Sequence, residues 1–340
     1  MTASAGPAAV SEEFAQLADP YRSELLAHCY RMLGSVHDAE DQVQETLLRA
    51  WRSYGDFEGR SSMRTWLYRI ATNTCLRALE TRSRRPLPSG LGEAAEDPDG
   101  PVPVPHLDVP WLQPFPDVLT RSGSDDPAAV VTARASTRLA LIAALQYLPP
   151  RQRAALILRD VLGWHAAEVA DLLGTSTAAA NSALQRARAQ IATLAPAEDD
   201  IAEPDDPKVR DLLARYAAAF ETADVAALTE LLRADAVLEM PPMSIWFAGR
   251  DNVTRFLGRR VLVRPGAFAL TPVHANGQPS VAAYERDGHG SYSAHAIQVL
   301  TVRDGRISRI VSFNDGGLFS AFGLPASPPE LRTGPYRAGG

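Results

Sequence analysis

Basic and aromatic side chains alternate along residues 60–85 in a pattern suited to single-stranded nucleic acid. The segment contains seven arginines and a single acidic residue. Its polar and aromatic candidates for DNA contact are Arg64, Trp66, Tyr68, Arg69 and Asn73. Unpaired bases stack on aromatic rings while guanidinium groups hold the phosphates. The composition therefore predicts a single-strand surface, and the alternative is that the aromatic rings pack in the core.

A second basic segment, residues 135–194, ends in the spacing of a helix-turn-helix. Two short amphipathic patterns, 165–173 and 177–194, flank the turn Gly174-Thr175-Ser176. The first residues of the second helix in such a motif face the bases of the major groove. Side chains there that can bind base edges or phosphates are Thr177, Asn181, Ser182, Gln185, Arg186 and Arg188. The alternative is a helical interaction module whose arginines are only solvated.

An acidic helix face precedes the basic segment and predicts a protein partner. Its side chains are Asp38, Asp41, Gln42, Glu45 and Arg49. A carboxylate-rich surface is repelled by DNA phosphates, so it should face a basic protein. The alternative is a solvated face.

The last third of the chain has few groups that could perform acid–base catalysis. Glu239 and Glu285 are the strand carboxylates, and His274 and His295 are the other candidate bases. An inward-facing histidine is more often a core residue than a catalyst, so we expect no enzyme here. A ligand pocket would be lined by Tyr216, Trp246, His274, Tyr284 and His295. No local spacing indicates a metal site, and we expect neither a metal nor a cofactor.

Helices position the first two groups of residues. In the first segment one helix ends at Gly34 and two more cover 35–54 and 62–81. The middle helix has an apolar stripe, which we expect to be buried: Val43, Leu47, Trp51 and Tyr54.

The last third changes from helical to strand periodicity. Three helical patterns come before or among six strand-like runs, and Asp304-Gly305 predicts a hairpin between the last two runs. This order indicates an α+β domain, so the expected fold class is two all-α domains followed by an α+β domain.

Two breaks in composition divide the chain. Residues 86–127 hold 10 of the 26 prolines, and residues 195–207 hold six acidic and no basic side chains. Both read as extended linkers. The predicted organisation is a helical domain at 12–86, a Pro-rich acidic linker at 87–134, the helix-turn-helix domain at 135–194, an acidic linker at 195–207, the α+β domain at 208–325 and a tail at 326–340.

Composition excludes several classes of protein. The chain has 340 residues, a net charge of −6 and 46% hydrophobic residues, which describes an ordinary globular protein. No apolar run is long enough to span a membrane, and the N-terminus has no signal-peptide pattern. The two cysteines, Cys29 and Cys75, lie in helical patterns and are expected to be packed thiols. We expect a cytoplasmic protein.

Several motifs resemble the sigma-70 type initiation factors. Residues 37–51, HDAEDQVQETLLRAW, look like their core-polymerase-binding helix, and residues 65–73, TWLYRIATN, look like the helix that recognises and melts the −10 element. Residues 148–153, together with residues 168–170, are similar to the N-terminal part of the −35-binding domain. The absence of other sigma regions in between is typical of the extracytoplasmic-function (ECF) group. The third segment resembles the SnoaL-like or ketosteroid-isomerase-like cone domain.

The resemblance implies roles for the residues above. Polymerase would be bound by Asp38, Asp41, Gln44 and Glu45. The −10 element would be recognised and opened by Arg64, Trp66, Arg69 and Asn73, and the −35 element by the residues given for 177–188. Gln42 departs from the family, which usually has an apolar residue there.

The implied partners are core RNA polymerase and promoter DNA, both double- and single-stranded. An anti-sigma factor and a small-molecule ligand of the cone domain are two further candidates. The cone domain is expected to modulate the sigma domains rather than to catalyse a reaction. Two alternatives are a ligand-responsive helix-turn-helix regulator and a SnoaL-like enzyme fused to a DNA-binding module.

Overall fold

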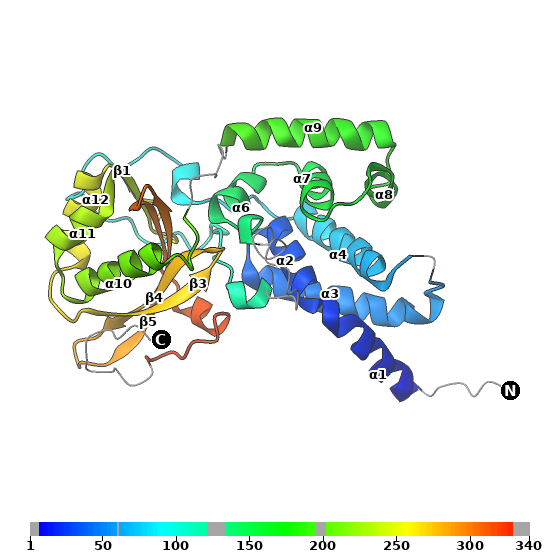
Figure 1. Cartoon of the computed structure of the whole chain (residues 1–340), viewed down its shortest axis with the longest axis horizontal. Helices are drawn as coiled ribbons and strands as arrows, with labels where there is room; N and C mark the ends of the chain where they lie inside the picture. The colour runs from blue at the N-terminus through cyan, green and yellow to red at the C-terminus, as the bar shows by residue number, and fades with distance from the viewer. Residues whose placement is uncertain (1–6, 60, 121–133, 195–201, 329–340) are drawn as a thin grey trace. The chain divides into compact units, whose positions relative to one another are not determined.

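The computed structural model describes residues 7–59, 61–120, 134–194 and 202–328 (Figure 1). Its contacts divide the chain into two compact units. The N-terminal unit comprises Met1–Arg85 and Asp117–Pro196, and the C-terminal unit comprises Pro86–Pro116 and Ala197–Gly340.

The N-terminal unit is helical in its described residues. Its α-helices are α1 (Pro7–Ala18), α2 (Arg22–Leu33), α3 (Val36–Ser53), α4 (Met63–Glu80), α6 (Leu139–Leu145), α7 (Pro150–Leu156), α8 (Ala166–Leu172) and α9 (Thr177–Leu194). Shorter 3-10 and π turns extend or join them at η1 (Asp19–Tyr21), η2 (Tyr54–Asp56), η4 (Asp117–Thr120) and η5 (Ile157–Val161). The predicted ends of α2 and α3 follow from local chemistry. Gly34 adopts φ 71° where α2 ends, and the Ser35 hydroxyl accepts a hydrogen bond from the Asp38 N–H at the start of α3.

The core of the first helices corrects two expectations. The buried face of α3 consists of Val36, Ala39, Val43, Thr46 and Ala50, whereas Trp51 is 44% exposed. The Thr46 hydroxyl donates to the Gln42 carbonyl, so a polar residue can be buried there at little cost. The predicted apolar stripe is therefore buried at Val43, half-buried at Leu47 and Tyr54, and wrong at Trp51.

Tyr68 is the second correction. It was expected on the surface beside Trp66, but it is 1% exposed in the core. Its hydroxyl donates to the Glu24 carboxylate at 3.1 Å, which satisfies the buried phenol. The two cysteines are free buried thiols, as predicted.

The C-terminal unit is a curved mixed sheet with helices on one side. The helices are α10 (Pro207–Glu221), α11 (Val225–Leu231) and α12 (Arg250–Phe256), with short turns η3 (Pro88–Gly90), η6 (Leu257–Val261) and η7 (Gly316–Ser320). The strands are β1 (Leu232–Glu239), β2 (Trp246–Ala248), β3 (Phe268–Ala275), β4 (Gln278–Arg286), β5 (Tyr292–Arg303) and β6 (Arg306–Phe313). Within the described residues they form one sheet in the order β2-β1-β6-β5-β4-β3.

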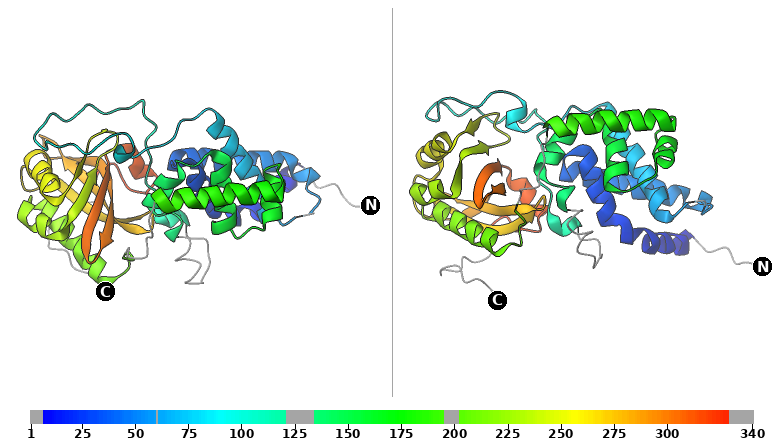
Figure 2. Two further views of the ribbon diagram at one scale, coloured as in Figure 1. Left: turned by 90° about the horizontal axis from the view of Figure 1, so that it is seen from above. Right: turned by 45° about the horizontal axis from the view of Figure 1, so that its top comes forward.

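The sheet is antiparallel except for the pairing of β1 with β6, which is parallel. Asp304 and Gly305 both have positive φ, and Arg303 pairs with Arg306 across them. The hairpin predicted from this dipeptide is confirmed. Figures 1 and 2 show α10, α11 and α12 together along one side of the curved sheet, where Tyr216, Phe220 and Leu300 belong to the same apolar core.

Candidate polymerase and nucleic-acid interfaces

Helix α3 exposes only part of the predicted acidic face. Asp41 and Gln44 are exposed, and Glu45 pairs with Arg49 one turn later. Trp51 follows on the same helix and is exposed, although a large aromatic ring is usually buried. The exposed surface of α3 thus combines acidic groups with an aromatic ring. Aromatic residues are enriched in protein interfaces, and the acidic groups favour a basic partner.

Asp38 has an internal partner. Its carboxylate forms ion pairs with Arg82 and Arg85, which follow α4, and its side chain is 15% exposed. The two guanidinium groups compensate the charge of this partly buried carboxylate and connect the start of α3 to the residues that follow α4. Of the four predicted polymerase-binding residues, the structure thus places Asp38 in a structural ion-pair cluster and the other three at the surface.

Helix α4 carries the four residues predicted for the −10 element, and three of them, Arg64, Trp66 and Arg69, have partners within the protein. The Trp66 ring lies against Phe57 with ring centroids 4.7 Å apart and is half-buried. Arg64 Nη2 is 2.7 Å from Glu24 Oε2, and this hydrogen-bonded carboxylate raises the pKa of Arg64. Asn73 is exposed. Of these three side chains, Asn73 is exposed and Arg64 and Trp66 are half-buried.

Arg69 links α4 to the helix-turn-helix within the N-terminal unit. Its Nη1 is 2.7 Å from Asp171 Oδ2 on α8. Both side chains are substantially exposed, so this ion pair contributes little stability. Arg69 can therefore exchange Asp171 for a phosphate at small cost.

Helix α9 exposes all six residues predicted for the −35 element: Thr177, Asn181, Ser182, Gln185, Arg186 and Arg188. Ala180, Leu184 and Ala187 form its buried face, and Gly174 has φ 61° in the turn before it. Figure 1 shows α8 and α9 joined by this short turn. Arg188 forms a two-pronged ion pair with Asp160, which raises the pKa of Arg188. The helix is therefore exposed as a major-groove reader requires, with one arginine already held by the protein.

Two arginines are buried in the N-terminal unit and hold its helices together. Arg153 on α7 donates to the carbonyls of Met32, Gln146 and Leu148, and Arg31 on α2 donates to Ser136. Burial lowers the pKa of each arginine to about 10, so both remain charged at neutral pH. Main-chain carbonyls, together with the Ser136 hydroxyl and the Gln146 amide oxygen, accept hydrogen bonds from them in place of carboxylates.

The structure joins two of the five residues predicted for a ligand pocket in the last domain, because the rings of Phe220 and Phe268 lie between Tyr216 and His295. Tyr216 is buried under the sheet, where its hydroxyl donates to Gln298 Oε1 at 2.9 Å, and Tyr284 donates to the Pro325 carbonyl. Burial raises the pKa of both phenols. Trp246 donates to the Gly92 carbonyl, and His274 is exposed on β3.

His295 contacts Glu285. Its Nδ1 is 3.1 Å from Glu285 Oε2, and its ring lies against Phe268. Burial lowers the pKa of His295, and the Glu285 charge opposes that shift. Within the described residues no group of three or more metal-ligating side chains comes together.

Residues 86–116, most of the predicted first linker, lie along the C-terminal unit (the cyan-to-green trace in Figure 2). They are extended, as the prolines require, but they are fixed at several points. The Ser89 N–H donates to Glu239 Oε1 at 2.9 Å, and that buried carboxylate also pairs with Arg309. At the other end the Phe115 N–H donates to Asn276 Oδ1 at 2.9 Å.

A third contact holds the middle of this segment. The Asp99 carboxylate pairs with Arg255 and Arg259, and the Asp99 carbonyl accepts a hydrogen bond from Arg260. The prolines correctly excluded a helix, but nothing in the local sequence indicated that Glu239, Asn276 and the three arginines would bind this segment. Other parts of the predicted linkers and tail, at 121–133, 195–201 and 329–340, lie outside the described residues.

Comparisons with known protein families agree with the observed fold, in which a helical unit is combined with an α+β unit. Residues 17–85 match the family model of sigma-70 region 2, residues 138–191 match sigma-70 region 4, and residues 213–310 match the SnoaL-like domain. Together with the observed helices and mixed sheet, this confirms the expected fold class. The fold and its exposed recognition helix define a DNA-binding initiation factor with an added α+β domain.

Two relatives match over most of their length. The chain is 53% identical to the ECF RNA polymerase sigma factor SigG of Mycobacterium tuberculosis over 319 residues, which cover 93% of this chain and 85% of SigG. It is 32% identical to SigJ of the same organism over 297 residues, covering 84% of this chain and 86% of SigJ. The crystal structure of SigJ matches with a TM-score of 0.59 at 27% identity, covering 94% of this chain and all of that one.

The chain belongs to the family of ECF RNA polymerase sigma factors. It directs transcription initiation with core RNA polymerase at promoter DNA, and sigma factors are not enzymes. The predicted sigma-factor function is confirmed, and the alternative of a helix-turn-helix regulator that acts without polymerase is wrong. No helix in the described ranges has the length and apolar character needed to cross a membrane.

Proposed function

We propose that three surfaces of the N-terminal unit make the contacts of initiation. The acidic face of α3 binds polymerase through Asp41, Gln44 and Glu45, with Asp38 supporting the helix. Helix α4 serves the −10 element and α9 reads the −35 element. The exposure of all six predicted residues on α9 carries this assignment. An anti-sigma factor would act by covering the α3 surface, including the exposed ring of Trp51.

The C-terminal unit modulates the sigma regions through its hold on residues 86–116. This segment leads from region 2, which ends at residue 85, toward region 4, which begins at residue 138. As an unattached chain, residues 86–116 could extend to about 105 Å at roughly 3.4 Å per residue. When the C-terminal unit holds the segment, its two ends stay at a fixed distance and it cannot extend further. Restricting this span restricts where the two DNA-binding regions can bind together.

The contacts of Asp99 and Asn276 support this mechanism, because each fixes the segment to the body of the C-terminal unit. A substitution that loosens the segment should act like removal of the unit that holds it. A small-molecule ligand of the C-terminal unit would act on the sigma regions in the same way, by changing how firmly residues 86–116 are held.

Transcription in vitro tests the proposal. Full-length protein is compared with Asp99→Asn, Asn276→Ala and a deletion of residues 208–340, on a pool of genomic promoters with core polymerase. Asp108→Asn is the matched control, because Asp108 is an exposed aspartate of the same segment. We expect the two contact variants to shift promoter output severalfold in the direction of the deletion while the control does not. Unchanged output from both contact variants and the deletion would refute the regulatory role.

A further inference from the structure

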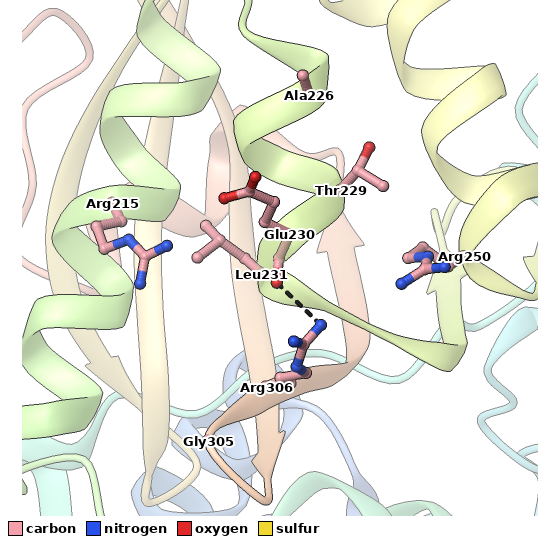
Figure 3. Close-up of a pocket in the computed structure, with 8 residues that line it drawn as sticks. All are labelled: Arg215, Ala226, Thr229, Glu230, Leu231, Arg250, Gly305 and Arg306. Atoms are coloured by element: carbon pink, nitrogen blue, oxygen red, sulfur yellow. Dashed lines mark hydrogen bonds between the residues drawn. The ribbon is translucent and has the colours of Figure 1, made fainter.

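A pocket of about 810 Å³ opens on the helical side of the C-terminal unit and contains three arginines (Figure 3). Its lining residues are Arg215, Ala226, Thr229, Glu230, Leu231, Arg250, Gly305 and Arg306. The arginines come from three elements that are distant in sequence: α10, the start of α12 and the start of β6. Figure 3 shows Arg215 and Arg250 on opposite sides of the C-terminal end of α11, with Arg306 below it. None of the residues predicted for a ligand pocket lines this one.

The fold itself positions one of these guanidinium groups. Arg306 Nη1 donates to the carbonyls of Glu230 at 3.2 Å and Leu232 at 3.5 Å, at the C-terminal end of α11. The last carbonyls of a helix have no partner within the helix, so a cation there is favourable. Among the described residues the Arg306 guanidinium makes no other hydrogen bond and no ion pair. Its remaining N–H groups are therefore available to a ligand.

The positive charges of the other two arginines also have few carboxylates near them. Across the described part of the chain, Arg215 has no ion-pair partner. The nearest carboxylate to Arg250 is its neighbour Asp251, with Nε 3.8 Å from Oδ1 on a side chain that is 97% exposed. Arg250 Nε is buried without a hydrogen-bond partner among the described residues. The pocket thus holds three guanidinium groups against the single carboxylate of Glu230.

Arg215 and Arg306 are exposed and solvated, and Arg250 is half-buried, so an anion that joins all three guanidinium groups gains charge-assisted hydrogen bonds without costly desolvation of the arginines. Guanidinium groups match the oxygens of phosphates in paired hydrogen bonds and stay charged at every physiological pH. The volume is in the range of small-molecule sites, and Ala226 and Leu231 supply apolar surface. We propose that this pocket binds a small phosphorylated molecule with two or more phosphoryl groups, held by Arg215, Arg250 and Arg306. Binding of the ligand does not depend on the proposed regulatory role of the C-terminal unit. Only an effect of the bound ligand on transcription rests on that role.

Calorimetric titration of the full-length protein tests binding without polymerase or DNA. Inorganic pyrophosphate is the probe in one arm and ATP in the other, both without divalent cations. We expect saturable binding at one site, weakened at least tenfold by Arg215→Ala and strengthened severalfold by Glu230→Gln, which removes the opposing charge. Tighter binding of ATP than of pyrophosphate would assign the site to nucleotides. Equal affinities would assign it to the phosphoryl groups alone, which still supports the proposal.

Arg210→Ala is the matched control, because Arg210 is an exposed arginine on the same helix outside the pocket. Absence of binding, or equal weakening by Arg210→Ala and Arg215→Ala, would overturn the proposal in favour of a non-specific charge effect. Circular dichroism of each variant confirms that it is folded. Because the titration contains no polymerase, its failure leaves the result of the transcription test unaffected.

Discussion

The buried imidazole of His28 makes the N-terminal unit sensitive to acid. His28 on α2 is fully buried, and its Nε2 is 3.0 Å from Thr72 Oγ1. The Thr72 hydroxyl donates to the Tyr68 carbonyl, so His28 must be the donor to Thr72 and carries its proton on Nε2. Its Nδ1 has no partner among the described residues. A second proton would therefore occupy Nδ1 without an acceptor and near the charge of Arg31.

Burial and the Arg31 charge lower the pKa of His28 from 6.5 to about 3. The unfolded chain therefore binds a proton at this residue at a higher pH than the folded chain does. The stabilisation is complete above pH 6.5 and is lost progressively as the pH falls toward 3. Between pH 8 and pH 5 the loss from this one group is about 2 kcal/mol of unfolding free energy.

The substitution His28→Gln isolates this contribution, because glutamine keeps an N–H donor for Thr72 and cannot gain a charge. The assay is hydrogen exchange of the α2 amides in the full-length protein, corrected for the intrinsic rate at each pH. The opening free energy of the natural protein should fall by about 2 kcal/mol more than that of the variant between pH 8 and pH 5. A parallel fall in both proteins would refute the reasoning, because His28 would then titrate normally in the folded state.

Three further predictions concern other parts of the molecule. Glu239→Ala removes the buried acceptor of the Ser89 N–H and should lower the opening free energy of residues 87–92 by about 1–3 kcal/mol, which would appear as faster amide exchange there. Glu239→Gln keeps an acceptor oxygen and should lower this free energy less. In gel-shift titrations, Asn181→Ala should weaken binding to the cognate −35 element by about 1–3 kcal/mol, whereas Arg186→Ala should weaken binding to all sequences alike. If Asn181→Ala weakened binding to random DNA as much as to the cognate element, the base-reading role of Asn181 would be contradicted. Burial raises the pKa of the Cys75 thiol, so a thiol reagent should modify the native protein only as fast as the N-terminal unit opens, and rapid labelling without denaturant would contradict the packing.

Local patterns predicted the elements of this protein well. The end of α2 at Gly34, the turn at Gly174 and the hairpin at Asp304-Gly305 each depend on a few neighbouring residues, and each is observed. The motifs around α3 and α4 are specific enough to indicate the family from residue types and spacing alone. Helix ends, turns and hairpins that depend only on neighbouring residues can be predicted directly from the sequence.

Burial was predicted less well, because large apolar side chains are not always inside. Helix α3 buries Ala39, Thr46 and Ala50 while it exposes Trp51. Small residues allow helices to pack closely, and the hydroxyl of Thr46 is satisfied by its own helix. A search for large apolar residues at helical spacing selects Trp51, which the fold leaves free for a partner.

Long-range contacts could not be predicted at all. The attachment of residues 86–116 depends on Asn276 and Glu239, which are about 150 residues away in the chain. The convergence of Arg215, Arg250 and Arg306 likewise depends on the packing of α10, α12 and β6. No composition or period identifies such partners, because the sheet must first form to bring them together.

The most direct test of the assignment as a sigma factor is transcription by purified core RNA polymerase on a pool of genomic promoters, with and without the full-length protein. We expect transcripts from defined start sites to appear only when the protein is added. A variant with both Asn181→Ala and Arg186→Ala should lose them, while Arg210→Ala should retain them. Absence of specific transcripts, with DNA retained by the protein alone, would contradict the assignment.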